Sequence, residues 1–185
     1  MQALIDAIAK GEILNANIAA VLSSRSDAYA LERASSVGIA TLVEKPDFTL
    51  KKPERRIEHS NRILKHCREY AIDLIINAGF LSVLSGAIID DYKGRIINIH
   101  PALLPKYGGQ GMYGEHVHKA VLEAGAKESG CTVHYVEAGI DSGPVILQRR
   151  VPVYESDTVA SLAERILKEE HIAIVEAVRL IISEE

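Results

Sequence analysis

Cysteine, tryptophan and long hydrophobic runs are scarce or missing in this sequence, and each shortage excludes a class of protein. Tryptophan is absent, and Cys67 and Cys131 are the only cysteines among 185 residues. Their positions match neither a zinc-binding pattern nor a disulfide framework, so we expect two inert packing residues in a reducing, cytoplasmic environment. The longest apolar stretches, such as residues 172–175, are too short to cross a bilayer, and no basic stretch with an apolar signal core follows Met1. Neither a membrane partner nor export is therefore expected.

An excess of charge of either sign is also missing. Lysine and arginine together number 21 against 25 acidic residues, which gives a net charge of -4. This balance exerts no general attraction on phosphate backbones, so nucleic acid is not an expected partner. Hydrophobic residues at 48%, charged residues at 25% and a mean hydropathy of +0.07 exclude disordered, collagen-like and coiled-coil chains. We expect residues 1–185 to fold as a single domain.

Strand-like and helix-like apolar patterns alternate along the chain. Short apolar runs that end in glycine or polar residues predict strands, and apolar residues at intervals of three and four predict helices. The predicted strands are residues 17–22, 72–77, 95–100, 132–136 and 144–153, with a further short element at 39–43. The predicted helices are residues 1–11, a short segment that ends near Gly38, and residues 54–70, 114–124 and 158–182. This alternation predicts an α/β fold, a Rossmann-like and mostly parallel sheet with helices on both faces.

Three polar segments lie at or beside predicted strand ends, where open parallel sheets bind their ligands. They are residues 77–80, 98–105 and 141–144. Asn98 and His100 stand two residues apart on one strand, so their side chains leave the same face of the sheet and can converge on one atom. An amide and an imidazole placed in this way stabilise an oxyanion on a carbonyl under attack, and a carboxylate such as Asp141 can orient the imidazole, keep it protonated and accept a proton.

Other histidines and glycines have plainer interpretations. Cys131 and His134 lack a third metal ligand, so strand packing is favoured for both. His116 and His118 point to different faces of a helix, and surface positions are favoured over metal binding. The glycines of residues 107–111 do not follow a strand in the spacing that binds a dinucleotide, and a mobile loop is the better interpretation. The mixed charges of residues 51–56 are typical of a solvated connection.

The motifs as a set resemble the phosphoribosylglycinamide formyltransferase family of folate-dependent enzymes. The resemblance rests on NIHPALLP at residues 98–105 followed by DSGPVI at residues 141–146. It continues through AGF at residues 78–80, GCTVHYV at residues 130–136 and EH at residues 170–171, and so covers nearly the whole chain. We therefore identify residues 1–185 as a formyltransferase domain that resembles this family.

This resemblance implies transfer of a formyl group from 10-formyltetrahydrofolate to the amine of glycinamide ribonucleotide in purine biosynthesis, with no metal. Asn98 and His100 would donate hydrogen bonds to the oxyanion. Asp141 would raise the pKa of His100 and relay a proton through water. The resemblance also implies a cis peptide bond between Leu104 and Pro105.

The same resemblance assigns binding residues for both small-molecule substrates. The pterin of the folate would lie against the backbone of a short segment and against the loop from Val136 to Asp141, with Arg56 as a further folate-binding candidate. The short segment consists of Leu81, Ser82, Val83 and Leu84. Ser82 stands where the family often has a basic or bulkier residue. Glu170 matches an acidic residue near the ribonucleotide.

The start of the chain departs from the family, whose members open with an apolar strand and a glycine-rich turn that binds the substrate phosphate. We therefore expect a domain truncated at its N-terminus, in which the strands at residues 18–22 and 72–77 present unpaired backbone groups. Dimerisation or rearrangement near that gap is favoured over an empty slot. A start codon upstream of Met1 is the alternative.

Two other functions stay open at this point. A degenerate paralogue could bind folate or a partner subunit without turnover, in line with the missing strand but not with the intact Asn98, His100 and Asp141. A formyltetrahydrofolate hydrolase would release the formyl group without an amine. Hydrolases of this kind usually carry an extra N-terminal domain, and methionyl-tRNA formyltransferases an RNA-binding extension, for which this chain has no room.

Overall fold

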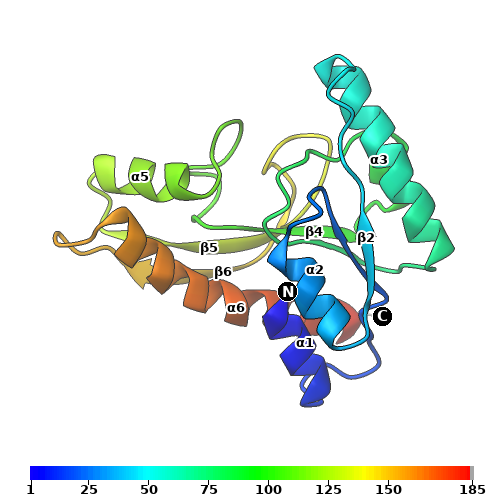
Figure 1. Ribbon diagram of the computed structural model, residues 1–185. Coiled ribbons are helices and arrows are strands. Elements are labelled where there is room, and N and C mark those ends of the chain that lie inside the picture. The colour runs from blue at the N-terminus through cyan, green and yellow to red at the C-terminus, as the bar shows by residue number, and fades with distance from the viewer. Residues whose placement is uncertain (184–185) are drawn as a thin grey trace. The chain divides into compact units, whose positions relative to one another are not determined.

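The computed structural model describes residues 1–183 and divides into two compact units. The first unit is Met1–Ile96 and the second is Ile97–Glu185 (Figure 1). Helices and strands alternate through the first unit and into the second, which confirms the predicted α/β class. The first unit contains α1 (Gln2–Ala9), β1 (Ala20–Ser23), α2 (Tyr29–Ser36), β2 (Ala40–Val43), α3 (Lys52–Glu69), β3 (Ile75–Asn77) and α4 (Ala87–Asp91). The second contains β4 (Ile96–His100), which begins at the boundary, α5 (Glu115–Glu123), β5 (Glu128–Tyr135), β6 (Val145–Pro152) and α6 (Val159–Ser183).

Strands β1 and β2 of the first unit form a parallel pair, with Ala20 opposite Ala40 and Ser23 opposite Val43. A parallel pair needs a crossover connection, and α2 supplies it by packing on both strands. Ala34, the fully buried residue of α2, has a side chain small enough for this close packing. Strand β1 covers residues 20–23 rather than the predicted 17–22, because its pairing with β2 begins only at Ala20.

Helix α3 begins at Lys52 rather than at the predicted Glu54, because Pro53 fits the first turn of a helix, where its missing N–H is not needed. The helix buries Ile63, Leu64 and Cys67 and packs on α4. Sequence patterns missed α4, which has only five residues. Its start depends on Gly86, whose φ of +74° favours a residue without a Cβ.

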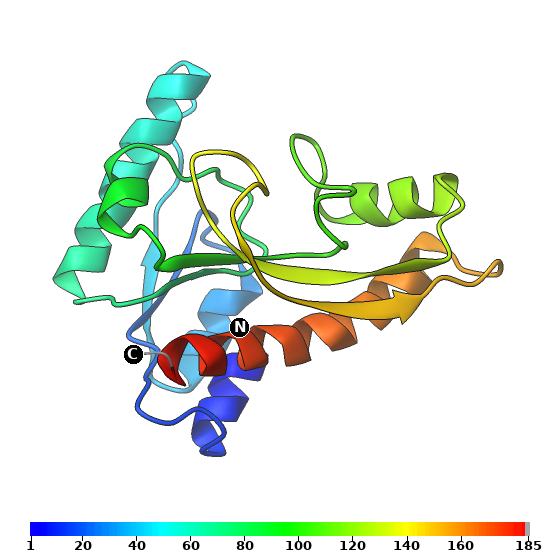
Figure 2. The ribbon, with the colours of Figure 1, turned by 180° about the vertical axis from the view of Figure 1, so that it is seen from behind.

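Strands β4, β5 and β6 of the second unit pair antiparallel. Parallel pairing, as predicted, is found in β1 and β2, whereas both pairings among β4, β5 and β6 are antiparallel. Between β5 and β6 the cause is chain length, because the nine residues 136–144 are too few for a helical crossover. In Figures 1 and 2, α6 runs along β5 and β6, and α5 lies beside the first turns of α6, on which it packs.

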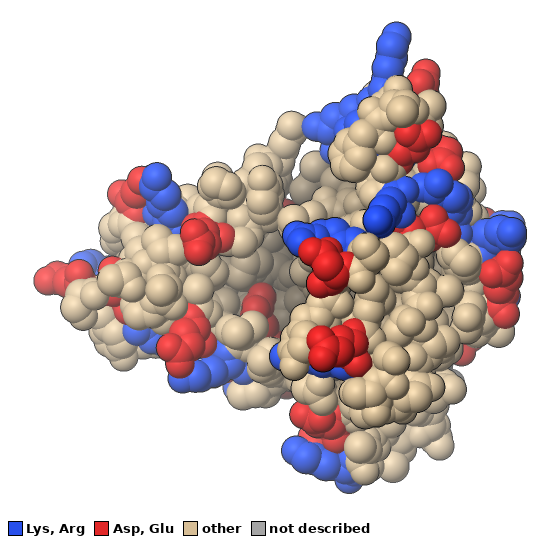
Figure 3. Space-filling model, viewed as in Figure 1, with Lys and Arg blue, Asp and Glu red and all other residues tan. Residues whose placement is uncertain are grey.

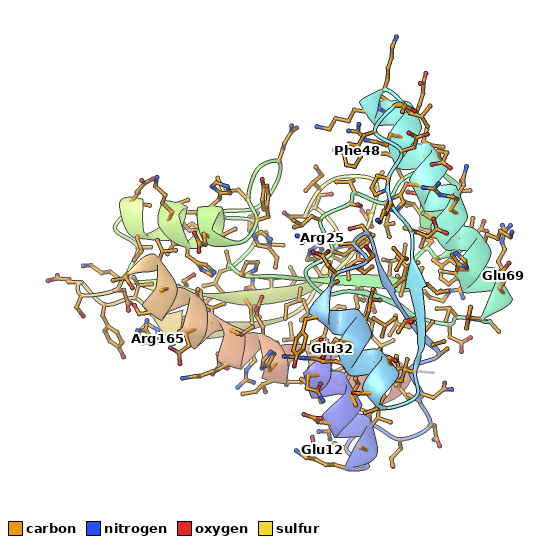
Figure 4. The ribbon with its side chains drawn as sticks, in the orientation of Figure 1. Glu12, Arg25, Glu32, Phe48, Glu69 and Arg165 are labelled. Atoms are coloured by element: carbon orange, nitrogen blue, oxygen red, sulfur yellow. The ribbon has the colours of Figure 1, made fainter. Side chains whose placement is uncertain are left out.

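The core of the second unit lies between its strands and α6. Residues 97, 131 and 133 of the sheet and residues 162, 166 and 173 of α6 are fully buried, and α6 packs on β5 and β6. Arg165, labelled in Figure 4, joins the start of α6 to the end of β6. Its guanidinium donates to both carboxylate oxygens of Asp157, each at 2.7 Å, and to the carbonyl of Pro152 at 2.9 Å.

Both cysteines are buried and free, as the sequence predicts. Burial raises the pKa of Cys67 to about 11 and that of Cys131 to about 12, so both thiols stay protonated near neutral pH. The Leu104–Pro105 peptide bond is cis, as expected. Through residue 183, no helix combines the length and the apolar character that a membrane span requires.

The sequence predicted that β1 and β3 present unpaired backbone groups at the position of a missing strand. Within residues 1–183 these two strands belong to different sheets, so they do not close onto each other. The amide of Ile75 at the start of β3 donates instead to the carbonyl of Arg95, the residue before β4. Dimerisation stays a prediction.

Gly143 controls how closely the end of β5 approaches the start of β6. A Cβ at this position would lie 1.9 Å from the carbonyl oxygen of Tyr135, and the backbone there is already fixed by the bond from Tyr135 N–H to the Pro144 carbonyl. We expect Gly143→Ala to lower the free energy of unfolding by about 3 kcal/mol or more, because backbone must move. Chemical denaturation measures this loss.

Gly125→Ala is the matched control. A Cβ there would meet no atom within 4 Å, so the substitution carries only the cost of its positive φ, about 1 kcal/mol. Equal losses in the two variants would show that the contact with Tyr135 is unimportant.

Candidate functional site

The pairing of β4 with β5 gathers four polar side chains on one face of the sheet. Asn98 lies directly opposite His134, and His100 lies directly opposite Thr132. Directly opposite residues of an antiparallel pair share a face, and residues two apart on a strand do so as well. The register therefore places all four side chains together, while Ile97 and Val133 face the other side.

His100 is almost completely buried, and both of its ring nitrogens face oxygen atoms. Nε2 donates to the carbonyl of Tyr107 at 2.8 Å, since a carbonyl can only accept. Nδ1 lies 3.6 Å from Oδ2 of Asp141. The predicted pair of His100 and Asp141 is thus close in space, although 41 positions separate the two in the sequence. What each residue does in the reaction stays a prediction.

The Asp141 carboxylate lies between two histidine rings, and the backbone of Asp141 has a left-handed conformation. Its φ is +53°, its Oδ2 accepts from the backbone N–H of Gly109 at 2.9 Å, and its Oδ1 lies 3.7 Å from Nε2 of His134. The glycine-rich loop at residues 107–111 thus contacts the site through Tyr107 and Gly109. The sequence had suggested only a mobile loop.

The protonation states of this pair differ from the expected ones. Burial lowers the pKa of His100 below its ordinary value, and this effect outweighs the rise caused by the Asp141 carboxylate. Burial raises the pKa of Asp141, but hydrogen bonding to its charged form, including the bond from the Gly109 N–H, lowers this pKa overall. Asp141 therefore acts on His100 in the predicted direction, but it does not keep His100 protonated at neutral pH. The pair consists of a neutral imidazole and a carboxylate.

Sequence reasoning missed His134 as a member of the site. It is 2% exposed, and its ring approaches Asn98 and the Tyr135 carbonyl rather than serving only as packing. The signal was present, because His134 and Thr132 show the same two-residue spacing as Asn98 and His100. This spacing places His134 beside Asn98 only once it is known that β5 pairs with β4.

Of the two histidines on α5, one matches its predicted surface position and one does not. His116 is exposed, as predicted. His118 is only 6% exposed, so the surface interpretation was wrong for this residue. Burial lowers the pKa of His118. His118 lies with Val117 and Val121 among the buried residues of α5, a helix that packs on α6.

The predicted folate residues divide between the units. Residues 81–84 of the first unit form an irregular segment between β3 and α4, in which Leu81 is 69% exposed and Leu84 is 3% exposed. Arg56 lies half-buried on α3. In the second unit, Val136 follows β5 directly and is half-buried. Their contacts with folate stay predictions.

Glu170, the predicted ribonucleotide residue, lies on α6 in the second unit. Burial raises its pKa to about 7, well above the usual range of a carboxyl group. Such a shift is common at functional sites. In the described chain, residues 1–183, no group of three or more histidine, cysteine, aspartate or glutamate side chains is placed to hold a metal ion.

Comparison with known proteins gives the class to which this fold and site belong. Residues 1–178 match the profile of the formyl transferase family, and the chain belongs to that family. It is 39% identical over 171 residues to phosphoribosylglycinamide formyltransferase of Escherichia coli, a match that covers 92% of this chain and 76% of that protein.

Two further relatives extend this result. The chain is 40% identical over 185 residues to the trifunctional purine biosynthetic protein adenosine-3 of Drosophila melanogaster, of which it spans only 13%. Among solved structures, glycinamide ribonucleotide transformylase 1 from Symbiobacterium toebii superposes with a TM-score of 0.87 at 40% identity. That match covers 97% of this chain and 80% of the other.

The raised pKa of Glu170 leads to a prediction about stability. The folded chain holds this proton up to about pH 7, whereas the unfolded chain releases it near pH 4.5, so the unfolded state binds fewer protons in between. Stability contributed by this group therefore falls as the pH rises through that window. We expect the melting temperature of Glu170→Gln, relative to the unmodified chain, to rise between pH 4 and pH 8. Thermal unfolding across this range measures the difference.

Glu164→Gln is the control on the same helix, because the Glu164 side chain is 72% exposed. Its melting temperature relative to the unmodified chain should change little with pH. A Glu170→Gln difference that stays constant from pH 4 to pH 8 would show that Glu170 titrates normally.

Proposed function

We propose that this chain transfers a formyl group from 10-formyltetrahydrofolate to the amine of glycinamide ribonucleotide, a step of purine biosynthesis. The observation that carries the proposal is the convergence of Asn98, His100 and Asp141 on one face of β4 and β5. Membership of the formyl transferase family and the names of its relatives support the choice of reaction and substrates. We further propose that the two units act as one formyltransferase domain, in the cytoplasm.

The donors of this site suit a carbonyl oxygen that gains negative charge. The bound folate would supply an N-formyl group, which the substrate amine attacks at carbon. Asn98 offers amide N–H groups, and His100 offers the Nε2–H that now donates to Tyr107. In the reaction the formyl oxygen would replace the Tyr107 carbonyl as the acceptor of this bond. Two such donors in a buried site stabilise the developing charge more strongly than water does.

Asp141 is suited to accept the proton that the attacking amine loses. Its lowered pKa keeps it ionised, and its Oδ2 lies 3.6 Å from the ring of His100, a distance that leaves the carboxylate free to bond to water. Through such a water beside His100, the amine proton would pass to the folate nitrogen, whose bond to the formyl carbon breaks as tetrahydrofolate leaves. This route needs only the side chains of the second unit.

Charge on the surface agrees with small-molecule substrates. Figure 3 shows lysine and arginine interspersed with aspartate and glutamate on the viewed face, without a broad field of one sign. We propose that Glu170 contacts the ribonucleotide, and that residues 81–84, Val136, Asp141 and Arg56 contact the folate.

A direct assay tests the proposed function. Purified protein is mixed with 10-formyltetrahydrofolate, and the absorbance change on loss of the formyl group is followed with and without glycinamide ribonucleotide. We expect turnover only when the ribonucleotide is present, because its amine is the acceptor. Turnover without the amine would identify a hydrolase instead. Folate binding without turnover would favour a degenerate paralogue.

Substitutions at the site test the roles of its residues. We expect His100→Ala and Asp141→Asn each to lower kcat between about a hundredfold and ten-thousandfold, as the loss of a general acid or base does. Asn98→Ala should lower kcat about a hundredfold or more, because it removes an oxyanion donor. Steady-state kinetics on the folded variants measures these losses.

His116→Ala serves as a matched control for the histidine substitution, since His116 is an exposed histidine on α5. Its kcat should equal that of the unmodified chain. Near-normal rates in His100→Ala, Asp141→Asn and Asn98→Ala would refute the assignment of all three residues.

A further inference from the structure

His134 is a buried histidine with both ring nitrogens engaged, and the proposed reaction gives it no role. It stands directly opposite Asn98 in the pairing of β4 with β5. Its Nδ1 lies 2.8 Å from the carbonyl oxygen of Tyr135, and its Nε2 lies 3.2 Å from Nδ2 of Asn98. A bulge in the pairing of β5 with β6 falls between Val133 and His134. Bulges re-aim side chains next to active sites, which fits the position of this ring.

The two contacts fix which nitrogen of the neutral ring carries the hydrogen. A carbonyl oxygen can only accept, so Nδ1 must be the donor to Tyr135. Nε2 then keeps its lone pair and accepts a hydrogen bond from the Asn98 amide. The lone pair of His134 thus determines how the Asn98 amide is turned. The nitrogen of the amide faces His134, and the other hydrogen on that nitrogen stays free to donate.

We propose that His134 is a positioning residue that holds the Asn98 amide with its free N–H directed at the formyl oxygen of the substrate. This inference rests on the proposed function. An Asn98 amide rotated by 180° would present its own oxygen to the developing negative charge and would repel it. A side chain amide alone has little preference between these two orientations, because its oxygen and nitrogen are nearly equal in size. The acceptor on His134 removes that ambiguity.

Asp141 is the other group through which His134 could act. Oδ1 of Asp141 lies 3.7 Å from Nε2 of His134, compared with 3.2 Å for Nδ2 of Asn98. Only the shorter distance is within hydrogen-bond range. The geometry therefore favours Asn98 as the residue that His134 positions, and coupling measurements can separate the two routes.

A double-mutant cycle on kcat tests the proposal. We expect His134→Ala to lower kcat about tenfold to a hundredfold, with KM for both substrates changed much less, because the lost interaction acts on the transition state. In the Asn98→Ala background the same substitution should lower kcat by no more than about twofold, because its target is gone. An equal loss in both backgrounds, or coupling to Asp141→Asn in place of Asn98→Ala, would overturn the proposal.

His134→Gln is the conservative variant. Its side-chain carbonyl can accept from Asn98 in place of Nε2, so most of the lost kcat should return. His118→Gln is the matched control, because it alters a second buried histidine of the same unit. Its effect on kcat should be the same with and without Asn98→Ala. Failure of His134→Gln to exceed His134→Ala in kcat would contradict the proposal.

Nitrogen-15 NMR of the histidine side chains tests the hydrogen bond without any turnover. We expect His134 to show the tautomer with hydrogen on Nδ1, and its Nε2 signal to shift in Asn98→Ala. Hydrogen on Nε2, or an Nε2 signal unmoved by Asn98→Ala, would overturn the proposal even if formyl transfer is confirmed. If the unmodified chain lacks formyl transfer, the proposed function fails, and the NMR result still decides whether His134 orients Asn98.

Discussion

The register between β4 and β5 is the constraint on which the candidate site depends. It sets Asn98 opposite His134 and His100 opposite Thr132, so four polar side chains share one face. A slip of one residue would turn the β4 side chains to the opposite face. Burial opposes such a slip, because Ile97 and Val133 are fully buried on that other face and α6 packs on β5. Chemistry on one face of the sheet is thus fixed by packing on the other.

Thr132 extends this constraint from the strands to the loop beyond β4. Its hydroxyl donates to the carbonyl of Ala102 at 2.6 Å and accepts from the amide of Leu104 at 3.0 Å. Gln148 on β6 donates to the same hydroxyl and to the carbonyl of Leu104, each at 2.9 Å. The chain leaving β4 is therefore held against β5 and β6 as it leads to Tyr107, whose carbonyl meets His100.

Patterns within short stretches of sequence predicted the features that depend on neighbouring residues alone. The alternation of elements gave the α/β class, and the spacing of Asn98 and His100 on one strand indicated a shared face. His134 belongs to the site because β5 pairs with β4, and this pairing cannot be predicted from a short stretch of sequence. The same holds for the burial of His118, which α5 turns inward. The lowered pKa of His100 was missed because burial, not charge, decides its direction. Helix α4 escaped notice because five residues carry too little periodicity.

The backbone of Asp141 shows what this arrangement demands of the chain. Asp141 has a φ of +53°, a conformation that favours glycine, and its ionised carboxylate is largely buried. The backbone conformation opposes folding, and strain of this kind collects at functional positions. Selection for thermostability alone would favour relief of this strain by glycine, whereas selection for turnover would keep the aspartate.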